Sequence, residues 1–293
     1  MVWSSDVLHG VPEHPNRCKR DLPAGLLSLV DERAWAAGVL VIAAHPDDET
    51  IGAGGVLRRF PVIAVAHVTD GAPADRRWWS DPALASREVY AGVRRAELTC
   101  ALALAGIPVE RIRTLGRGDQ RASFDLPALT RDIVRLLDVT RPGVVLTHAY
   151  EGGHPDHDAT AFAAHAARAL RGGEGGPAIV EFACYFADGD GIATGAFLPS
   201  EDAEAVEVAL SAEDRAVKRA MLECFGTQRE TLAQFPVGEV ERFRIAPEYD
   251  FTRPPHEGTL HYERFDWGID GAEWRARAAE ALETLGIAGG VPC

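Results

Sequence analysis

One apolar run that ends in a cluster of ionisable residues constrains the fold of this chain more than any other stretch. Residues 39–44 have the length and composition of a buried strand, and the ionisable residues that follow are His45, Asp47, Asp48 and Glu49. Glycines and a helical pattern come next. A buried strand that delivers charged side chains into the turn before a helix is typical of α/β proteins. In such proteins ligands bind beyond the carboxyl ends of parallel strands.

The same alternation of apolar strands and amphipathic helices recurs along the chain. Further strands are expected near residues 62–68, 112–115 and 144–147, and helices at 86–105, 126–139 and 158–170. This order predicts a doubly wound, mostly parallel, Rossmann-like sheet with helices on both faces. We expect one domain over residues 1–293, with a core at about 36–235 and an irregular, aromatic-rich C-terminal extension at about 236–293.

Composition excludes several classes of function. The 293-residue chain carries a formal net charge of −14 at pH 7, and its sequence pI is about 5.2. Binding to nucleic acid requires clustered Lys and Arg, and an acidic chain is also poorly suited to an anionic membrane surface. The five cysteines are scattered without a Cys-x-x-Cys pair, and we see no signal peptide or membrane span. We therefore expect a cytoplasmic protein with reduced thiols and no stable membrane association.

A second polar cluster follows the strand predicted at 144–147. It contains His154 and His157, with a proline at position 155 suited to the first residue of a helix. In a parallel sheet this cluster and the one at 45–49 fall on the same edge. Imidazole and carboxylate are ligands of Zn²⁺ and related ions, and a cation would also offset the repulsion among Asp47, Asp48 and Glu49. The sequence predicts a metal site there, and His148 is interpreted as structural.

The two clusters together support a resemblance to a known family. Ala-His-Pro-Asp-Asp-Glu at 44–49, paired with His-Pro-Asp-His at 154–157, resembles the signature of the PIG-L/LmbE-like zinc-dependent N-acetylglucosamine deacetylases. That family removes the acetyl group from N-acetylglucosamine-type amino sugars. The resemblance covers roughly residues 38–230 and implies one zinc ion per chain, or another divalent metal.

The resemblance also implies a role for each motif residue. His45, Asp48 and His157 would ligate the metal. Asp47 would be the general base, and His154 would protonate or stabilise the tetrahedral intermediate. Such roles agree with the chemistry of amide hydrolysis, which needs an activated water and a positioned proton carrier.

Two further residues match the family pattern outside the clusters. Arg94 stands in an Arg-x-x-Glu motif on the helix at 86–105 and is implied in sugar binding, as is Asp119, which follows the strand near 112–115. The chain departs from the family at Gly152, where some members carry a tyrosine that serves as an oxyanion donor. Tyr150 lies two residues earlier.

The substrate is expected to be a small-molecule N-acetylglucosaminyl glycoconjugate. Trp78 and Trp79 occupy a loop predicted to lie over the crevice, and other aromatic residues are frequent after about residue 235. Aromatic rings near a site favour bulky, flat groups, so we expect a natural product, with a glycopeptide antibiotic pseudoaglycone first. An aminoglycoside precursor and a thiol (glucosaminyl-inositol) precursor are the alternatives.

Two other classes of function are possible on the sequence. Glycines at 52, 54 and 55 after a strand faintly resemble a dinucleotide fingerprint, but the full spacing is absent and three carboxylates would face the pyrophosphate. A non-catalytic sugar-binding protein is the other alternative. A metal assay combined with an amine-release assay distinguishes these from a deacetylase.

Overall fold

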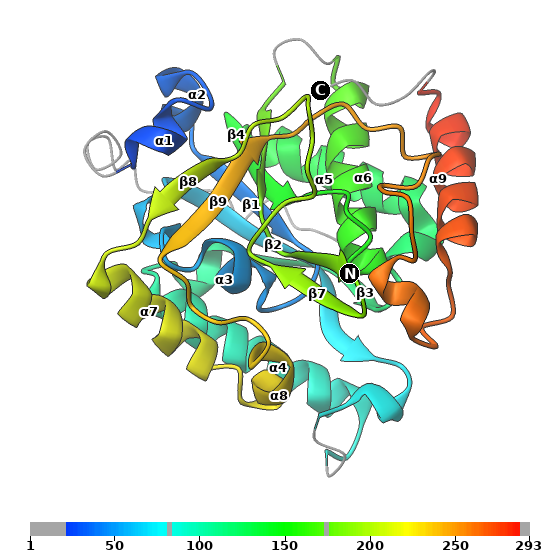
Figure 1. Cartoon of the computed structure of the whole chain (residues 1–293), viewed down its shortest axis with the longest axis horizontal. Coiled ribbons are helices and arrows are strands. Elements are labelled where there is room, and N and C mark those ends of the chain that lie inside the picture. The colour runs from blue at the N-terminus through cyan, green and yellow to red at the C-terminus, as the bar shows by residue number, and fades with distance from the viewer. Residues whose placement is uncertain (1–21, 81–83, 173–175, 288–293) are drawn as a thin grey trace.

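A mixed sheet forms the centre of the fold (Figure 1). The structure is a computed structural model that describes residues 22–80, 84–172 and 176–287. Among these residues seven strands pair in the order β3-β2-β1-β4-β5-β9-β8. The strands are β1 (Val39–Ala43), β2 (Val62–Pro73), β3 (Ile112–Asp119), β4 (Val144–His148), β5 (Ala178–Phe182), β8 (Val206–Ala209) and β9 (Val240–Ile245).

The first five strands in chain order are parallel, and the last two are not. Strand β1 pairs with β2 on one side and β4 on the other, β3 continues beyond β2, and β5 continues beyond β4. Strand β9 then runs antiparallel to β5, and β8 antiparallel to β9. A separate hairpin is formed by β6 (Tyr185–Asp188) and β7 (Gly191–Thr194). The parallel strands place their carboxyl ends along one edge of the sheet.

Helices cover both faces of the sheet, as the alternation of side chains in β1 requires. Val39 and Val41 face a core that includes residues of α4 and α7, whereas Leu40 and Ile42 face a core that includes α5, α6 and α9. Figure 1 shows these two groups of helices on different sides of the sheet. The helices are α1 (Ala24–Leu27), α2 (Glu32–Ala36), α3 (Asp48–Ala53), α4 (Arg87–Leu104), α5 (Leu126–Thr140), α6 (Pro155–Leu170), α7 (Ala212–Glu223), α8 (Arg229–Leu232) and α9 (Gly271–Leu285).

The predicted α/β fold, a mostly parallel central sheet with helices, is confirmed, and the structure adds order in three places. Strand β2 continues to Pro73, and strand β3 extends beyond the stretch expected at 112–115 and includes Asp119. The segment after residue 236, predicted to be irregular, contributes β9 to the central sheet and α9 to the core against α5 and α6. The two ends of the predicted domain, 1–21 and 288–293, lie outside the described residues.

Two smaller findings bear on the sequence-based expectations. In the described part of the chain, Cys100, Cys184 and Cys224 are free thiols, whereas positions 18 and 293 fall outside it. The search for membrane spans over the same residues finds no helix with enough length and apolar character to cross a bilayer.

Candidate active site

The two polar clusters meet at the carboxyl ends of β1 and β4. These strands are direct neighbours, with Val41 opposite Leu146, so the segments that leave them emerge side by side. Helix α3 begins at Asp48, directly after β1 and its turn, and α6 begins at Pro155 with His154 as its N-cap residue. Each cluster is therefore fixed by a strand on one side and a helix on the other.

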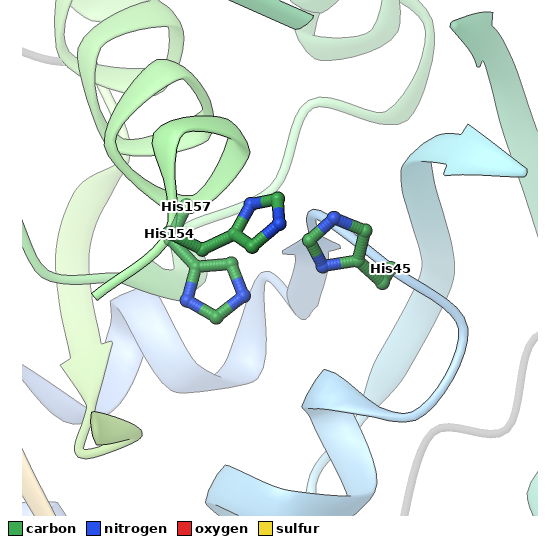
Figure 2. A group of neighbouring side chains, drawn as sticks. All are labelled: His45, His154 and His157. Carbon is green, nitrogen blue, oxygen red and sulfur yellow. The ribbon is translucent and has the colours of Figure 1, made fainter. Parts of the chain in front are cut away.

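Three imidazole rings form the centre of the site, as Figure 2 shows. His45, His154 and His157 each offer a ring nitrogen such that these donor atoms all lie within 4.8 Å of one another. The ring centroids of His45 and His154 are 4.4 Å apart, and those of His45 and His157 are 5.2 Å apart. All three residues are buried. The spacing of their donor atoms is compatible with a shared metal ion.

Asp48 joins the imidazoles of the two clusters. Its Oδ2 atom lies 3.1 Å from His45 Nδ1, and its Oδ1 atom lies 3.2 Å from His157 Nε2. The Nε2 atom of His148 is also within 3.3 Å of Asp48 Oδ2. Burial opposes ionisation of this carboxyl, yet the surrounding histidines hold its pKa well below the usual value. The structure thus brings together the three residues expected to ligate a metal.

Two more carboxylates contact the far side of the His45 ring. Asp119 Oδ1 lies 3.2 Å from His45 Nε2, and Asp156 Oδ2 lies 3.3 Å from the same atom. Asp156 is fully buried and accepts hydrogen bonds from the backbone N–H groups of Gln120 (2.6 Å) and Ala122 (2.9 Å). Burial lowers the pKa of His45, but Asp119 and Asp48 outweigh it and the pKa is raised well above the ordinary value. Such a concentration of carboxylates around one ring favours a cation.

Asp47 is held in a strained conformation beside the histidines. Its φ of 140° is in the region that favours glycine, and the residue is 6% exposed. Its Oδ2 atom accepts a hydrogen bond from Arg94 Nη2 at 3.1 Å. Burial raises the pKa of Asp47 to about 7 against the opposing effect of Arg94. A carboxyl with a pKa near neutrality is suited to general-base chemistry.

The position of Arg94 differs from the sequence-based expectation. Its side chain is buried, and besides Asp47 it donates hydrogen bonds to the carbonyl oxygens of Pro46 (2.7 Å) and Gly71 (3.3 Å). The guanidinium therefore fixes the turn that carries Asp47 and the extended end of β2. All of these partners belong to the protein. The guanidinium therefore positions Asp47, whether or not it also contacts a sugar.

His154 is fixed in one orientation by its place at the start of α6. Its Nδ1 atom accepts a hydrogen bond from the backbone N–H of Asp156 at 3.1 Å. Burial, together with His45 and His157, holds the pKa of His154 well below its ordinary value. A neutral ring that accepts through Nδ1 carries its hydrogen on Nε2, which leaves that N–H available as a donor.

The two tryptophans expected to face the substrate have different surroundings. Trp79 is 7% exposed, stacks on Tyr90 with ring centroids 5.2 Å apart, and donates its indole N–H to Pro73 O at 2.9 Å. The structure therefore places Trp79 in a packing role. Trp78 is partly buried, and its ring meets Phe265 and Trp267 edge-on at 6.2 and 6.0 Å.

Sequence reasoning missed three neighbours of the site. His148 was interpreted as structural but reaches Asp48, and Asp156 lies inside a recognised motif yet was not singled out for its contact with His45. Trp267 comes from the C-terminal segment, and its ring centroid lies 4.6 Å from that of His154. Only His148 and Asp156 could have been found from the sequence, because each lies in or beside the polar cluster that follows β4.

Tyr150 has no free hydroxyl with which to stand in for the glycine at position 152. Its hydroxyl donates to Arg253 O at 2.9 Å, and its ring stacks on Trp274. A side chain at Gly152 would also crowd the C-terminal segment, because a Cβ atom there would lie 2.6 Å from Leu260 Cδ2. The C-terminal segment thus occupies the space beside this position.

An α/β sheet with a buried cluster of histidines and carboxylates at the ends of β1 and β4 agrees with the comparisons to known proteins. Residues 40–168 match the family described as "PIG-L: GlcNAc-PI de-N-acetylase". This match confirms, over that part of the chain, the resemblance seen in the motifs.

Curated relatives and a solved structure extend this finding. The chain is 34% identical over 125 residues to a Bacillus subtilis protein described as "Probable N-acetyl-alpha-D-glucosaminyl L-malate deacetylase 2", covering 41% of this chain and 56% of that protein. It is 32% identical over 143 residues to the Rhodococcus jostii 1D-myo-inositol 2-acetamido-2-deoxy-alpha-D-glucopyranoside deacetylase, covering 41% and 49%. The chain spans about half the length of the curated relatives it matches. A deacetylase–teicoplanin complex shares the fold at a TM-score of 0.52 and 20% identity, covering 72% of this chain and 99% of that one.

Proposed function

We propose that this protein is a metal-dependent hydrolase that removes the N-acetyl group from an N-acetylglucosaminyl unit. The observation that carries the proposal is the convergence of His45, Asp48 and His157 from two strand ends, with Asp47 and His154 buried beside them. The PIG-L family domain and the descriptions of the sequence relatives support the same activity.

The donor set suits a divalent metal ion, with zinc as the proposed one. Two imidazoles and one carboxylate are a common catalytic zinc set that leaves a coordination position open. The nearest carboxylates, Asp48, Asp119 and Asp156, are crowded around His45, which is the kind of repulsion that a bound cation relieves. When bound, such an ion would supply Lewis-acid activation of water and of the amide carbonyl.

The residues of the chain would carry the protons and hold the transition state. Asp47, with its raised pKa and its hydrogen bond from Arg94, would take the proton of the attacking water. The Nε2–H of neutral His154 would donate a hydrogen bond to the developing oxyanion. Asp47, which would then hold the proton taken from the water, would pass it to the leaving amine.

We further propose that the substrate is a bulky natural-product conjugate, of the glycopeptide antibiotic pseudoaglycone kind. The support is the aromatic cluster of Trp78, Phe265 and Trp267, which reaches His154. Asp119, partly exposed, remains a proposed sugar-binding residue. The Rhodococcus relative favours a second candidate, an inositol glycoside that lacks an apolar aglycone. An aminoglycoside precursor is the third.

Acetate release by the zinc-loaded protein tests both parts of the proposal. The assay compares an acetylglucosaminyl glycopeptide pseudoaglycone, an acetylated aminoglycoside precursor and the inositol glycoside, alongside elemental analysis of the metal. We expect about one zinc per chain and the highest kcat/KM with the pseudoaglycone. Preference for the inositol glycoside would reject the aglycone but retain the deacetylase. No acetate from any substrate, with or without added zinc, would reject the activity itself.

A further inference from the structure

A loop from outside the family-matched region forms one side of the site. This C-terminal loop, residues 260–270, lies between β9 and α9 and docks on the segment that follows β4. The backbone N–H of His261 donates to Gly152 O at 2.9 Å. One carboxylate closes both ends of the loop, because Glu263 accepts from the backbone N–H groups of Leu260 and Gly271, each at 2.9 Å. The loop is therefore held in one shape against the site.

The loop presents the ring of Trp267 to His154. The centroids of these two rings are 4.6 Å apart, and the indole stacks on Phe265 at 4.5 Å with an interplanar angle of 12°. Trp78 packs its edge against the same pair. Aromatic neighbours thus fix the indole next to the proposed proton donor, and the tryptophan is only partly buried.

The indole N–H of Trp267 has no acceptor among the described residues. Its Nε1 atom is shielded from solvent and forms no hydrogen bond there. Trp79 and Trp274, by contrast, donate their indole N–H groups to Pro73 O and Pro155 O. A buried donor without a partner is unfavourable and uncommon, so this one calls for an acceptor supplied from elsewhere.

We propose that Trp267 is a substrate-binding residue of this enzyme. Its indole N–H donates a hydrogen bond to an acceptor oxygen of the acetamido sugar beside His154, and its ring, backed by Phe265, packs on the apolar face of the sugar and its aglycone. A polar group set in an aromatic wall is the usual way in which a pocket orients a ligand. The inference rests on the proposed function for the identity of the ligand.

Two substitutions and a matched control separate the N–H group from the ring. Trp267→Phe removes the donor and keeps an aromatic ring, whereas Trp267→Ala removes both. Trp35→Phe is the control, because Trp35 Nε1 is also buried without a partner. Trp35 stacks on Phe60 and precedes β1, at the opposite edge of the sheet from the site. The probes are free N-acetylglucosamine and octyl 2-acetamido-2-deoxyglucoside, measured with zinc-loaded protein.

Trp267→Phe should raise KM for both probes about fivefold, the usual consequence of losing one hydrogen bond. Trp267→Ala should raise KM for the octyl glycoside several-fold further than for the free sugar. Zinc content should be unchanged in both variants, and Trp35→Phe should match the wild type. A KM within twofold of wild type for Trp267→Phe would overturn the hydrogen bond, and equal effects of Trp267→Ala on the two probes would overturn the platform.

Calorimetric titration with the octyl glycoside keeps this inference separate from the proposed activity. If the wild type releases no acetate but binds the glycoside, and Trp267→Phe weakens that binding about fivefold, the deacetylase proposal fails and the role of Trp267 stands. If the wild type releases acetate and Trp267→Phe binds the glycoside as tightly as the wild type does, the role of Trp267 is rejected and the activity stands.

Discussion

The two sides of the candidate site are built in different ways. The histidine and carboxylate side comes from two short segments that leave neighbouring parallel strands, and both lie within residues 40–168. The aromatic side joins Trp78, after β2, to Phe265 and Trp267, before α9. The first is a buried set of ion pairs fixed by backbone geometry, and the second is a set of ring contacts between distant parts of the chain.

This difference suggests a division of labour. Strand ends that are locked by a sheet and two helix starts can hold reacting groups to the precision that catalysis needs. A loop that docks on them from the end of the chain can differ between relatives without disturbing those groups. We therefore expect substitutions on the first side to change turnover, and substitutions on the second side to change substrate affinity.

The largest expected effect is on the proposed general base. Asp47→Asn preserves the size of the side chain and its contact with Arg94, so zinc content and folding should remain as in the wild type. Because an amide cannot take the proton of water, kcat should fall by about 10²- to 10⁴-fold. Acetate release and elemental analysis measure the two quantities.

Asp70→Asn is the matched control for this substitution. Asp70 also lies near a strand end, in β2, but its carboxylate pairs with Arg87 at 2.6 Å and not with the histidines. Its loss should leave kcat within a few-fold of wild type. Full activity in Asp47→Asn, or an equal loss in both variants, would contradict the assignment of Asp47 as the base.

The next prediction concerns Trp78 and Trp79, two adjacent residues for which the sequence predicts the same role. Trp79→Ala should lower the free energy of unfolding by about 3 kcal/mol, because a buried ring stacked on Tyr90 leaves a cavity. Trp78→Ala should cost about 1 kcal/mol or less, since its ring is only partly buried, but should raise KM for the octyl glycoside. Denaturant unfolding and acetate release measure the two effects. The reverse pattern would show that Trp79 faces the substrate.

Much of the first side of the site could be predicted from the sequence, for a physical reason. An apolar strand followed by His45, Asp47 and Asp48 is a local pattern, and strand neighbours in a parallel sheet bring a second such pattern to the same edge. The same local logic predicts α6 after His154, because a proline at the first helical position is pre-organised for it.

The second side could not be predicted, because its contacts depend on tertiary packing. No periodicity in residues 260–270 indicates that Trp267 packs on His154. Likewise, no local pattern in residues 240–245 indicates that β9 joins the sheet next to β5. Arg94 illustrates the same limit within a recognised motif. Its spacing to Glu97 is visible in the sequence, but its burial behind Asp47 follows only from the packing of α4 on β2.

A substitution at Gly152 would disturb the contact between the two sides of the site. Gly152 has a φ of +70°, and a Cβ atom there would lie 2.6 Å from Leu260 Cδ2, at the start of the C-terminal loop. Gly152→Ala should therefore lower the free energy of unfolding by about 2 kcal/mol or more, from backbone strain and from the clash. It should also raise KM for the octyl glycoside with little change in zinc content.

Gly106→Ala separates the clash from the strain. Gly106 has a φ of +74°, but a Cβ atom there would meet nothing within 4 Å. The control should show only the strain, about 1 kcal/mol, with KM unchanged. If both variants lose the same free energy of unfolding relative to wild type, the loop can move away from the new Cβ atom without destabilising the protein. The contact at Gly152 would then not couple the two sides.

A buried ionic group forms another contact between the family-matched region and the later strands. Arg244 of β9 donates from Nε to Glu181 Oε2 at 2.7 Å and lies 3.3 Å from Glu151 Oε1. Two carboxylates thus share one guanidinium, away from solvent. Burial raises the pKa of Glu151 to about 8 and that of Glu181 to about 7, although Arg244 opposes both shifts. The folded protein therefore holds a proton here that the unfolded chain releases near pH 4.5.

This extra proton gives stability a pH dependence, which is the smallest effect we predict. A carboxyl whose pKa is raised on folding stabilises the native state at low pH, and that stability is lost as the pH rises from about 4.5 toward 8. Glu151→Gln has no proton to lose, so its free energy of unfolding relative to wild type should increase by about 1 kcal/mol between roughly pH 5.5 and 8.5.

The control is Glu207→Gln, because Glu207 pairs with Arg242 of the same strand but is exposed. Its difference in unfolding free energy from wild type should not vary with pH. If the Glu151→Gln difference is equally flat, the carboxylate is ionised throughout, and the contact between the two regions is a full ion pair.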